Sequence, residues 1–245
     1  MKKLSLLIVA TLVFLLTACG SGNNAGDTNS NESNKEDSKQ EEKQEAKLEI
    51  VDSTGAAWKD SIGTVWVHSS AIFKNTGSVP VDIGETQMNF KGQDDSILGT
   101  ANMIYSVPSV VLPGETAYIS ETTTLEGVAP EDYKETTYNY GYEETSAKPN
   151  LLEISGEKGA KGDEWTPYKV TGVVKNTTKE LQDDIRIAAA LFDSEGKLLG
   201  VLNGSVDVGV ASGSEAGFEL TYPDLPAGVA DKVSTIDVKA YAWTW

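Results

Sequence analysis

Residues 71–76 read Ala-Ile-Phe-Lys-Asn-Thr, and residues 172–177, 101 positions later, read Gly-Val-Val-Lys-Asn-Thr. At the same spacing, Ile-Leu-Gly at residues 97–99 corresponds to Leu-Leu-Gly at residues 198–200. In both cases the apolar positions and the residues that end the apolar run recur together. A pattern of this kind at one fixed period predicts an internal duplication.

The duplication divides the sequence into two predicted domains, residues 48–147 and residues 148–245. The junction falls near residues 146–150, which read Ser-Ala-Lys-Pro-Asn. Each half has about 100 residues, which is enough to enclose one small hydrophobic core.

The periodicity of both halves is that of β-strands. Apolar residues alternate with more polar ones over residues 65–73, 168–174 and 185–191, as they do on a strand with one buried face. Residues 75–78 and 193–196 contain Gly, Ser, Asn or Asp and supply turns between such runs. These features predict antiparallel strands joined by short turns.

One stretch, residues 180–191, is also compatible with a helix. Its repeat partner, residues 79–90, contains Pro80, Gly84 and Asn89, which favour strand or turn over helix. Short strands at intervals of about 8–12 residues are typical of a β-sandwich. The predicted fold class is therefore all-β, with two tandem antiparallel immunoglobulin-like sandwiches.

Both halves resemble the FxLYD family of bacterial extracytoplasmic immunoglobulin-like domains. The second half has Lys-Asn-Thr at a strand end and then, at residues 190–200, Ala-Leu-Phe-Asp-Ser-Glu-Gly-Lys-Leu-Leu-Gly; the first half has the Leu-Pro-Gly-Glu turn at residues 112–115. The turns at residues 90–95 and 211–215 depart from the family pattern. The resemblance implies a fold and an extracytoplasmic location, and it carries over no catalytic residue.

The amino-terminal residues 1–18 have the pattern of an export signal. A basic start is followed by an apolar run at residues 4–16, which is too short to span a bilayer. Residues 16–20, Leu-Thr-Ala-Cys-Gly, resemble the lipobox of bacterial lipoproteins. The resemblance implies that Cys19 receives a diacylglycerol and anchors the protein to the membrane. A buried free cysteine and a signal without lipidation are the alternatives.

Residues 19–47 form a predicted tether between the anchor and the first domain. From Gly20 onward the segment lacks aromatic residues, Val, Ile and Leu. Such a composition cannot bury enough apolar surface to offset the entropy of ordering. We expect a disordered segment that holds the folded part away from the lipid headgroups.

Composition excludes several functions. The chain has 20 Lys and Arg against 37 Asp and Glu, a formal charge of −17, which argues against binding nucleic acid. One Cys and one His exclude a disulfide framework and centres built on several histidines, and we expect no cofactor. The Arg-poor composition and the tether favour the outer leaflet of a Gram-positive cell membrane.

Candidate polar sites each have a structural alternative. His68 lies in a predicted strand without a recognisable nucleophile motif, so a sheet-surface or partly buried histidine is the simpler interpretation. Adjacent carboxylates on a strand point to opposite faces and rarely form one site. Residues 193–196 come nearest to a calcium loop, but they fit an ordinary hairpin turn. The adjacent carboxylate pairs are Glu131-Asp132, Asp94-Asp95, Glu143-Glu144 and Asp183-Asp184.

Aromatic residues near the ends of the two halves are the most suggestive candidates for binding. Tyr241, Trp243 and Trp245 alternate, and they lie opposite the preceding apolar positions of their strand. They predict an exposed row that stacks on sugar rings or accepts a protein edge. The alternative is that they cover the contact between the two domains. A core-facing position is the stronger interpretation for the alternating tyrosines of the first half, Tyr138, Tyr140 and Tyr142.

These observations predict a lipid-anchored surface protein that displays non-catalytic modules for binding or spacing, with an envelope protein or a glycan as partner. An accessory component of an envelope transport or cell-wall assembly complex is the alternative. No nucleophile with a paired base and no metal-ligating pattern is visible in the sequence, so we do not expect an enzyme.

Overall fold

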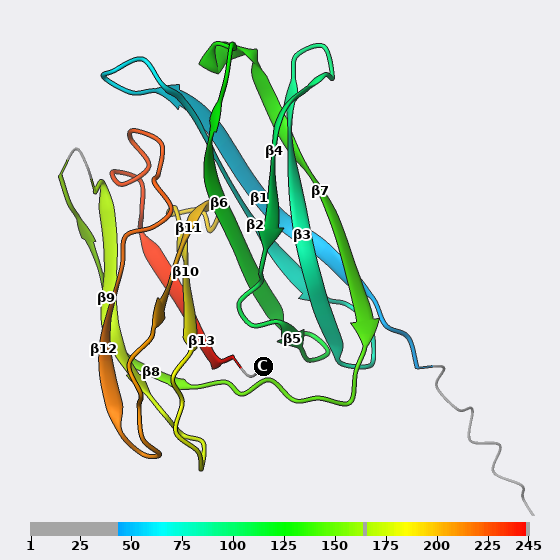
Figure 1. Ribbon diagram of the computed structural model, residues 1–245, viewed down its shortest axis with the longest axis vertical. Helices are drawn as coiled ribbons and strands as arrows, with labels where there is room; N and C mark the ends of the chain where they lie inside the picture. Colours follow the sequence, from blue (N-terminus) through cyan, green and yellow to red (C-terminus); the bar gives the residue numbers. More distant parts are fainter. Residues whose placement is uncertain (1–43, 164–165, 244–245) are drawn as a thin grey trace, which may run out of the picture. The chain divides into compact units, whose positions relative to one another are not determined.

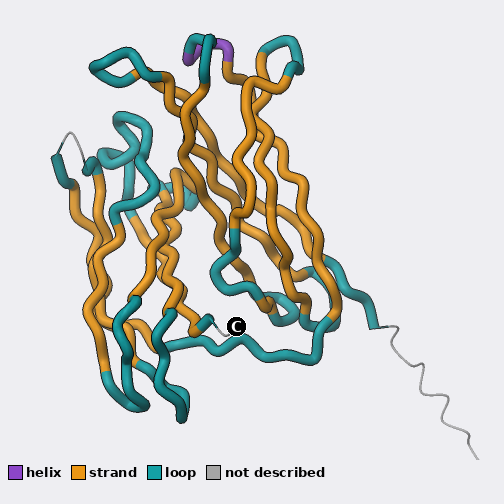
Figure 2. Tube along the Cα trace, in the orientation of Figure 1, coloured by secondary structure: helices purple, strands orange, loops and turns teal. Residues whose placement is uncertain are grey.

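The computed structural model describes residues 44–163 and 166–243. Strands and loops make up nearly all of this part of the chain, with one short 3-10 turn at Pro130–Asp132 (Figure 2). The predicted all-β, antiparallel class is confirmed, and the ambiguous stretch 180–191 contains no helix: residues 185–191 belong to a strand and residues 180–184 precede it. The strands are β1 (Leu48–Lys59), β2 (Val65–Asn75), β3 (Val81–Gly92), β4 (Ile97–Ile104), β5 (Val110–Val111), β6 (Thr116–Leu125), β7 (Tyr133–Glu144), β8 (Glu153–Lys161), β9 (Tyr168–Lys175), β10 (Ile185–Phe192), β11 (Leu198–Val206), β12 (Glu215–Leu220) and β13 (Thr235–Ala242).

The first seven strands form two sheets that enclose one core. One sheet has the order β1-β2-β6, and in the other β3 pairs with β4, β5 and β7 (Figure 1). Phe73 of β2, Phe90 of β3 and Ile119 of β6 are all fully buried in this core. The alternation predicted for residues 65–73 places Val67 and Phe73 there, but the opposite face of β2 is also buried at His68, Ser70 and Ile72.

The last six strands repeat this arrangement. The order β8-β9-β12 corresponds to β1-β2-β6, and β11-β10-β13 corresponds to β4-β3-β7. The second core contains Val170 and Val174 of β9 with Ile185, Ile187 and Leu191 of β10.

The Lys-Asn-Thr motif of the first half has a structural role. The side chain of Asn75, at the end of β2, is completely buried. Its Nδ2 donates to the carbonyl oxygens of Val79 and Val111, both at 2.8 Å, and its Oδ1 accepts the backbone N–H of Gly77 at 2.9 Å. Because Val111 belongs to β5 of the opposite sheet, this asparagine joins the two sheets at one end of the core.

Asn176 makes the same set of bonds in the second half. Its Nδ2 donates to the carbonyl oxygens of Glu180 and Val210 at 2.7 and 2.8 Å, and its Oδ1 accepts the N–H of Thr178 at 2.9 Å. This side chain is also completely buried. The motif that recurs in the sequence is therefore a recurring buried polar link.

A third apolar cluster joins the two halves through the outer faces of two sheets. Ile72 and Tyr118 from the sheet β1-β2-β6 pack with Ala188, Ala190 and other residues of the sheet β11-β10-β13. Because Ile185, Ile187 and Leu191 face the second core, β10 is buried on both faces. Alanines on the outer face allow the sheets to approach closely.

Hydrogen bonds reinforce this contact. The Tyr118 hydroxyl donates to the Asp237 carboxylate. Asn203 of β11 donates to the Ser120 hydroxyl at 2.8 Å, and the N–H of Leu198 donates to the Asp52 carboxylate at 3.1 Å. All of these residues belong to one compact unit of the chain, and the two halves share a polar and apolar interface.

Candidate functional site

Two of the predicted site residues, Cys19 and Trp245, lie outside the described residues. Within the described ranges, no helix is long and apolar enough to cross a bilayer. No group of three or more His, Cys, Asp and Glu side chains among those residues is placed to hold a metal ion.

The predicted exposed aromatic row is wrong for Tyr241, whose side chain is only 4% exposed. Tyr241 belongs to the cluster that joins the two halves, and its hydroxyl approaches the carbonyl oxygen of Ser106 at 3.5 Å. Trp243 packs against the same cluster, with its ring centroid 5.9 Å from that of Tyr241. The alternative interpretation is correct for Tyr241 and Trp243, because both side chains cover the contact between the halves. The reason is that the outer face of β13 lies against the first half and not against solvent.

The tyrosines of β7 face the first core. Tyr138, Tyr140 and Tyr142 are partly buried against it, and the Tyr140 ring lies 4.7 Å from that of Phe73. The Tyr138 hydroxyl lies 2.7 Å from the hydroxyl of Ser69. The core-facing interpretation of these three residues is confirmed.

His68 is buried in the contact between the halves and has a complete set of partners. Its Nδ1 lies 2.9 Å from the Thr122 hydroxyl, which donates to the carbonyl oxygen of Asp224. Its Nε2 lies 2.7 Å from the Ser70 hydroxyl, whose oxygen accepts the N–H of Val201. Because the Thr122 hydroxyl donates to Asp224, Nδ1 carries a proton and donates to Thr122, and in the neutral ring Nε2 accepts from Ser70. Burial lowers the pKa of His68 to about 3.

This arrangement is a structural link and not a catalytic pair. Both partners of the ring are hydroxyls, and the hydroxyl of Ser70 is itself buried and receives the backbone of the other half. A histidine base in hydrolytic triads is oriented by a carboxylate. The sequence allowed a partly buried histidine, and the structure buries it fully.

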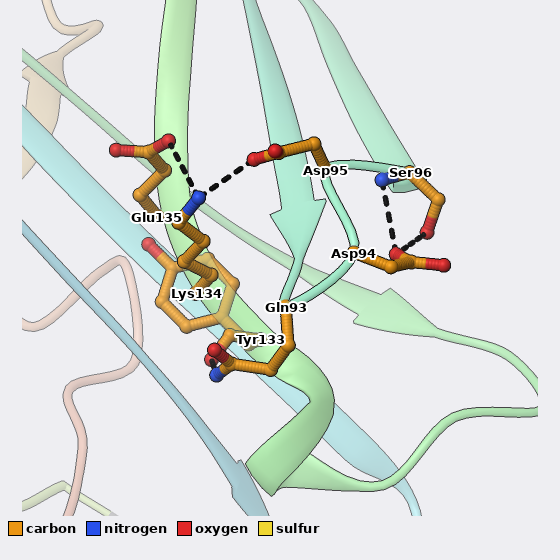
Figure 3. Close-up of polar contacts among 7 residues, drawn as sticks. All are labelled: Gln93, Asp94, Asp95, Ser96, Tyr133, Lys134 and Glu135. Atoms are coloured by element: carbon orange, nitrogen blue, oxygen red, sulfur yellow. Dashed lines mark hydrogen bonds and ion pairs between the residues drawn. The ribbon is translucent and has the colours of Figure 1, made fainter.

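Asp94 and Asp95 lie in the turn between β3 and β4, where each carboxylate has a partner (Figure 3). Asp94 accepts the N–H and the hydroxyl of Ser96 at 3.0 and 2.5 Å, and these bonds lower its pKa. Lys134 of β7 donates to Asp95 at 2.6 Å and lowers the pKa of that carboxyl. The pair therefore stabilises a hairpin and its neighbour strand.

The residues nearest to a calcium loop behave in the same way. Asp193 accepts the N–H groups of Glu195 and Lys197 at 2.9 and 3.0 Å, and Gly196 adopts a φ of 81°. These are the contacts of a hairpin turn, as the sequence indicated. Of the other pairs, Asp184 forms a bidentate ion pair with Arg186.

A cavity of about 700 Å³ opens where the segment after β7 leads into the second half. Its wall includes Asp82 of β3, Tyr105, which follows β4, and Glu143 of β7 from the first half, with Tyr241 and Trp243 from the second. Small-molecule sites in proteins have volumes of roughly 300–1,000 Å³ and often lie between packed units. We refer to this cavity as the seam cleft.

Three aromatic rings form one wall of the seam cleft. The Tyr105 ring meets the Trp243 ring edge to face at 5.6 Å, and Trp243 meets Tyr241 in the same manner. The Arg186 guanidinium lies 5.6 Å from the centre of the Trp243 ring. Tyr105 is 43% exposed, and its hydroxyl donates to Glu85 at 3.3 Å. It is the ring of this group that is open to a ligand.

Two carboxylates of the cleft face each other across neighbouring strands. Asp82 of β3 and Glu143 of β7 are direct partners in the antiparallel register. Burial, and then the charge of Glu143, raise the pKa of Asp82. No ion pair within the described residues involves either carboxylate.

Two smaller cavities adjoin the seam cleft through shared lining residues. One, of about 300 Å³, shares Tyr105 and Tyr241 with it and is also lined by Ser106. The other, of about 450 Å³, shares Glu85 and is lined by Thr86. The hydroxyls of Ser106 and Thr86 are buried and have no hydrogen-bond partner within the described structure.

The sequence did not indicate this cleft. Asp82 and Glu143 are 61 residues apart and meet only through the register of β3 with β7. In the sequence Glu143 belongs to the adjacent pair Glu143-Glu144, and Glu144 does not line the cleft. Tyr105 stands apart from any aromatic pattern. The sequence feature that indicated part of this site is the alternation of Tyr241 and Trp243. It predicted exposed side chains, whereas both side chains pack against the contact between the halves.

Comparison with known proteins finds no family model that matches the chain and no curated protein that is similar to it.

Proposed function

We propose that this protein is a lipid-anchored, extracytoplasmic binding protein without catalytic activity. In this proposal residues 1–18 are a signal peptide, and Cys19 carries the lipid at the head of a tether. Residues 45–47, which the sequence prediction included in that tether, are instead bonded to the turn after β2, and Ala46 packs against the first core. Residues 48–147 and 148–245 are two immunoglobulin-like modules of the FxLYD type.

The repeated architecture supports the proposal of two modules. The strand orders of the two halves correspond, except that β5 has no counterpart strand in the second half. Asn75 and Asn176, the motif residues, make the same three kinds of bond in their respective halves. Two unrelated halves would have no reason to share both features.

The seam cleft is the observation on which the proposal of binding rests. Its volume of about 700 Å³ is in the range of ligand sites, and both halves contribute to its wall. The wall combines aromatic rings with carboxylates, a composition suited to holding a ligand. Neither the cleft nor His68 offers a nucleophile with an oriented base, and this supports binding over catalysis.

The shared interface supports a role for the pair of modules as one rigid body. His68 and Ser70 in the first half are bonded to the backbone of the second, directly or through one hydroxyl. A cleft between two freely moving modules would change shape constantly, whereas one built on a bonded interface keeps its geometry.

The anchor and the binding activity are tested separately. Native mass spectrometry of the full-length protein, purified from its own membrane in detergent, should detect a bound small molecule. The adduct should disappear in Tyr105→Ala and persist in Thr177→Ala, an exposed position outside the cleft lining. An adduct that persists in Tyr105→Ala would show that the cleft is not the binding site.

A further inference from the structure

We propose that the seam cleft binds an organic cation, with its charged group between Asp82 and Glu143 and its apolar part against Tyr105. This inference rests on the proposed binding function and specifies the chemical class of the ligand.

The two carboxylates carry the first part of the argument. Like charges at directly opposed positions of an antiparallel pair destabilise the sheet. Asp82 and Glu143 occupy such positions at the wall of a cavity, and no cation of the described chain is paired with them. A positively charged group bound between them would remove the repulsion, and Lys148, the cation of the chain that lines the same cleft, forms no ion pair with either carboxylate.

The aromatic wall gives the second part, because it distinguishes an organic cation from a metal ion. Aromatic faces attract ammonium and guanidinium groups, and they contact apolar stems equally well. The molecule itself shows this preference, since the guanidinium of Arg186 lies over the Trp243 ring in the same aromatic group. Tyr105 is the exposed member of that group and lies in the same cavity wall as Asp82 and Glu143.

Two hydroxyls that are unpaired in the described part of the chain lie near the cleft but do not line it. Ser106 and Thr86 are each only 1% exposed, and their hydroxyls lack a hydrogen-bond partner within the described residues. Buried hydroxyls are normally satisfied, and leaving one unpaired costs free energy. Each residue lines a smaller cavity that shares lining residues with the seam cleft. Their hydroxyl oxygens are not accessible from that space, so the carboxylates and the aromatic wall alone support the binding of a cation.

One residue of the wall opposes the proposal and provides a test. Lys148 also lines the cleft and is exposed. Its ammonium group repels a cationic ligand at long range, so its removal should strengthen binding. A site for an anion would respond in the opposite way.

The experiment measures the affinity of the full-length protein in detergent for three probes by isothermal titration calorimetry. Choline is a compact organic cation, spermidine is an elongated one, and 3,3-dimethylbutanol is an uncharged analogue of choline with the same shape. We expect at least one cation to bind tenfold or more tightly than the uncharged analogue. Tighter binding of spermidine would indicate an elongated ligand, and tighter binding of choline a compact one.

Variants locate the site and its charge dependence. Asp82→Asn and Glu143→Gln should each weaken cation binding by about fivefold, as expected for the loss of one charge at close range in a solvated site. Tyr105→Leu keeps an apolar side chain, removes the ring and should also weaken binding. Lys148→Ala should strengthen it, and Glu195→Gln, an exposed carboxylate in the β10–β11 turn, should leave it unchanged.

Two results would overturn the inference. Equal affinity for choline and for its uncharged analogue would show that charge is not recognised, as would cation binding that is unaffected by Asp82→Asn and Glu143→Gln. In either case an adduct that depends on Tyr105 in native mass spectrometry would leave the proposed binding function intact. Failure of all three probes to bind would also reject this inference without affecting that adduct.

Discussion

The buried asparagine of the second half should contribute about 4 kcal/mol to the free energy of unfolding. In Asn176→Ala the N–H of Thr178 loses the Oδ1 acceptor, and an unpaired buried donor costs about 1–3 kcal/mol. The carbonyls of Glu180 and Val210 each lose one bond but keep another, from the Thr178 hydroxyl and from the N–H of Gln182. Each of those losses adds about 0.5–1.5 kcal/mol, so the total is about 2–6 kcal/mol, centred near 4 kcal/mol.

Urea denaturation followed by tryptophan fluorescence and circular dichroism measures this quantity. Thr177→Ala, the neighbouring exposed position, is the matched control and should change the unfolding free energy by less than about 0.5 kcal/mol. Asn75→Ala should resemble Asn176→Ala because the bonds are the same. A loss below about 1 kcal/mol in both asparagine variants would refute the reasoning that these side chains hold the sheets together.

Four further predictions follow from the interface, the cleft and the anchor. Because the His68 pKa is about 3 in the folded state and 6.5 as its ordinary value, the stability from its neutral form is complete above pH 6.5 and declines as the pH falls toward 3. At pH 5 the loss should be about 2 kcal/mol, measured by urea unfolding at both pH values, and it should be absent in His68→Gln. Ala190→Leu places a larger side chain at a fully buried position of the interface; it should lower the unfolding free energy by about 1–3 kcal/mol in the same assay, and an unchanged value would mean that the interface has spare room. In thermal denaturation of the unliganded protein, Asp82→Asn should raise the free energy of unfolding by about 0.2–1 kcal/mol, since it removes the repulsion from Glu143. A decrease would show that the pair is not repulsive. Cys19→Ala should abolish incorporation of labelled palmitate and release the protein from the membrane fraction, and retention of the label would place the lipid elsewhere.

The strand positions and the repeat were predictable because they depend on local patterns. The alternation in residues 185–191 predicts β10, and its inward side chains are those of the second core. Lys-Asn-Thr was recognisable because a buried asparagine at a strand end makes its bonds with backbone nearby in the sequence and in the following turns. Local patterns of this kind survive in one sequence without any relative for comparison.

The interface between the halves could not be predicted in the same way. Ala188 and Ala190 on β10, like His68 and Ser70 on β2, have side chains that are as common at a solvated sheet face as in a close contact. Nothing in such residues specifies that another sheet covers them. For the same reason Tyr241 was expected at the surface, although it is buried in that contact.

The cleft could not be predicted from the sequence because it depends on how distant segments pair and pack. The meeting of Asp82 with Glu143 requires the β3–β7 pairing, and the position of Tyr105 beside Trp243 requires the packing of β13 on the first half. Both are relations between distant segments, and no periodicity in the sequence encodes them.

The double burial of β10 has a practical consequence for any dissection of this protein. A cut in the segment between β7 and β8 would create two fragments, each with an uncovered sheet that holds Tyr118 in one fragment and Tyr241 in the other. Such surfaces are adhesive, and the fragments would self-associate when expressed alone. Low solubility of a single half would therefore result from the uncovered interface and would not show that the half is unable to fold.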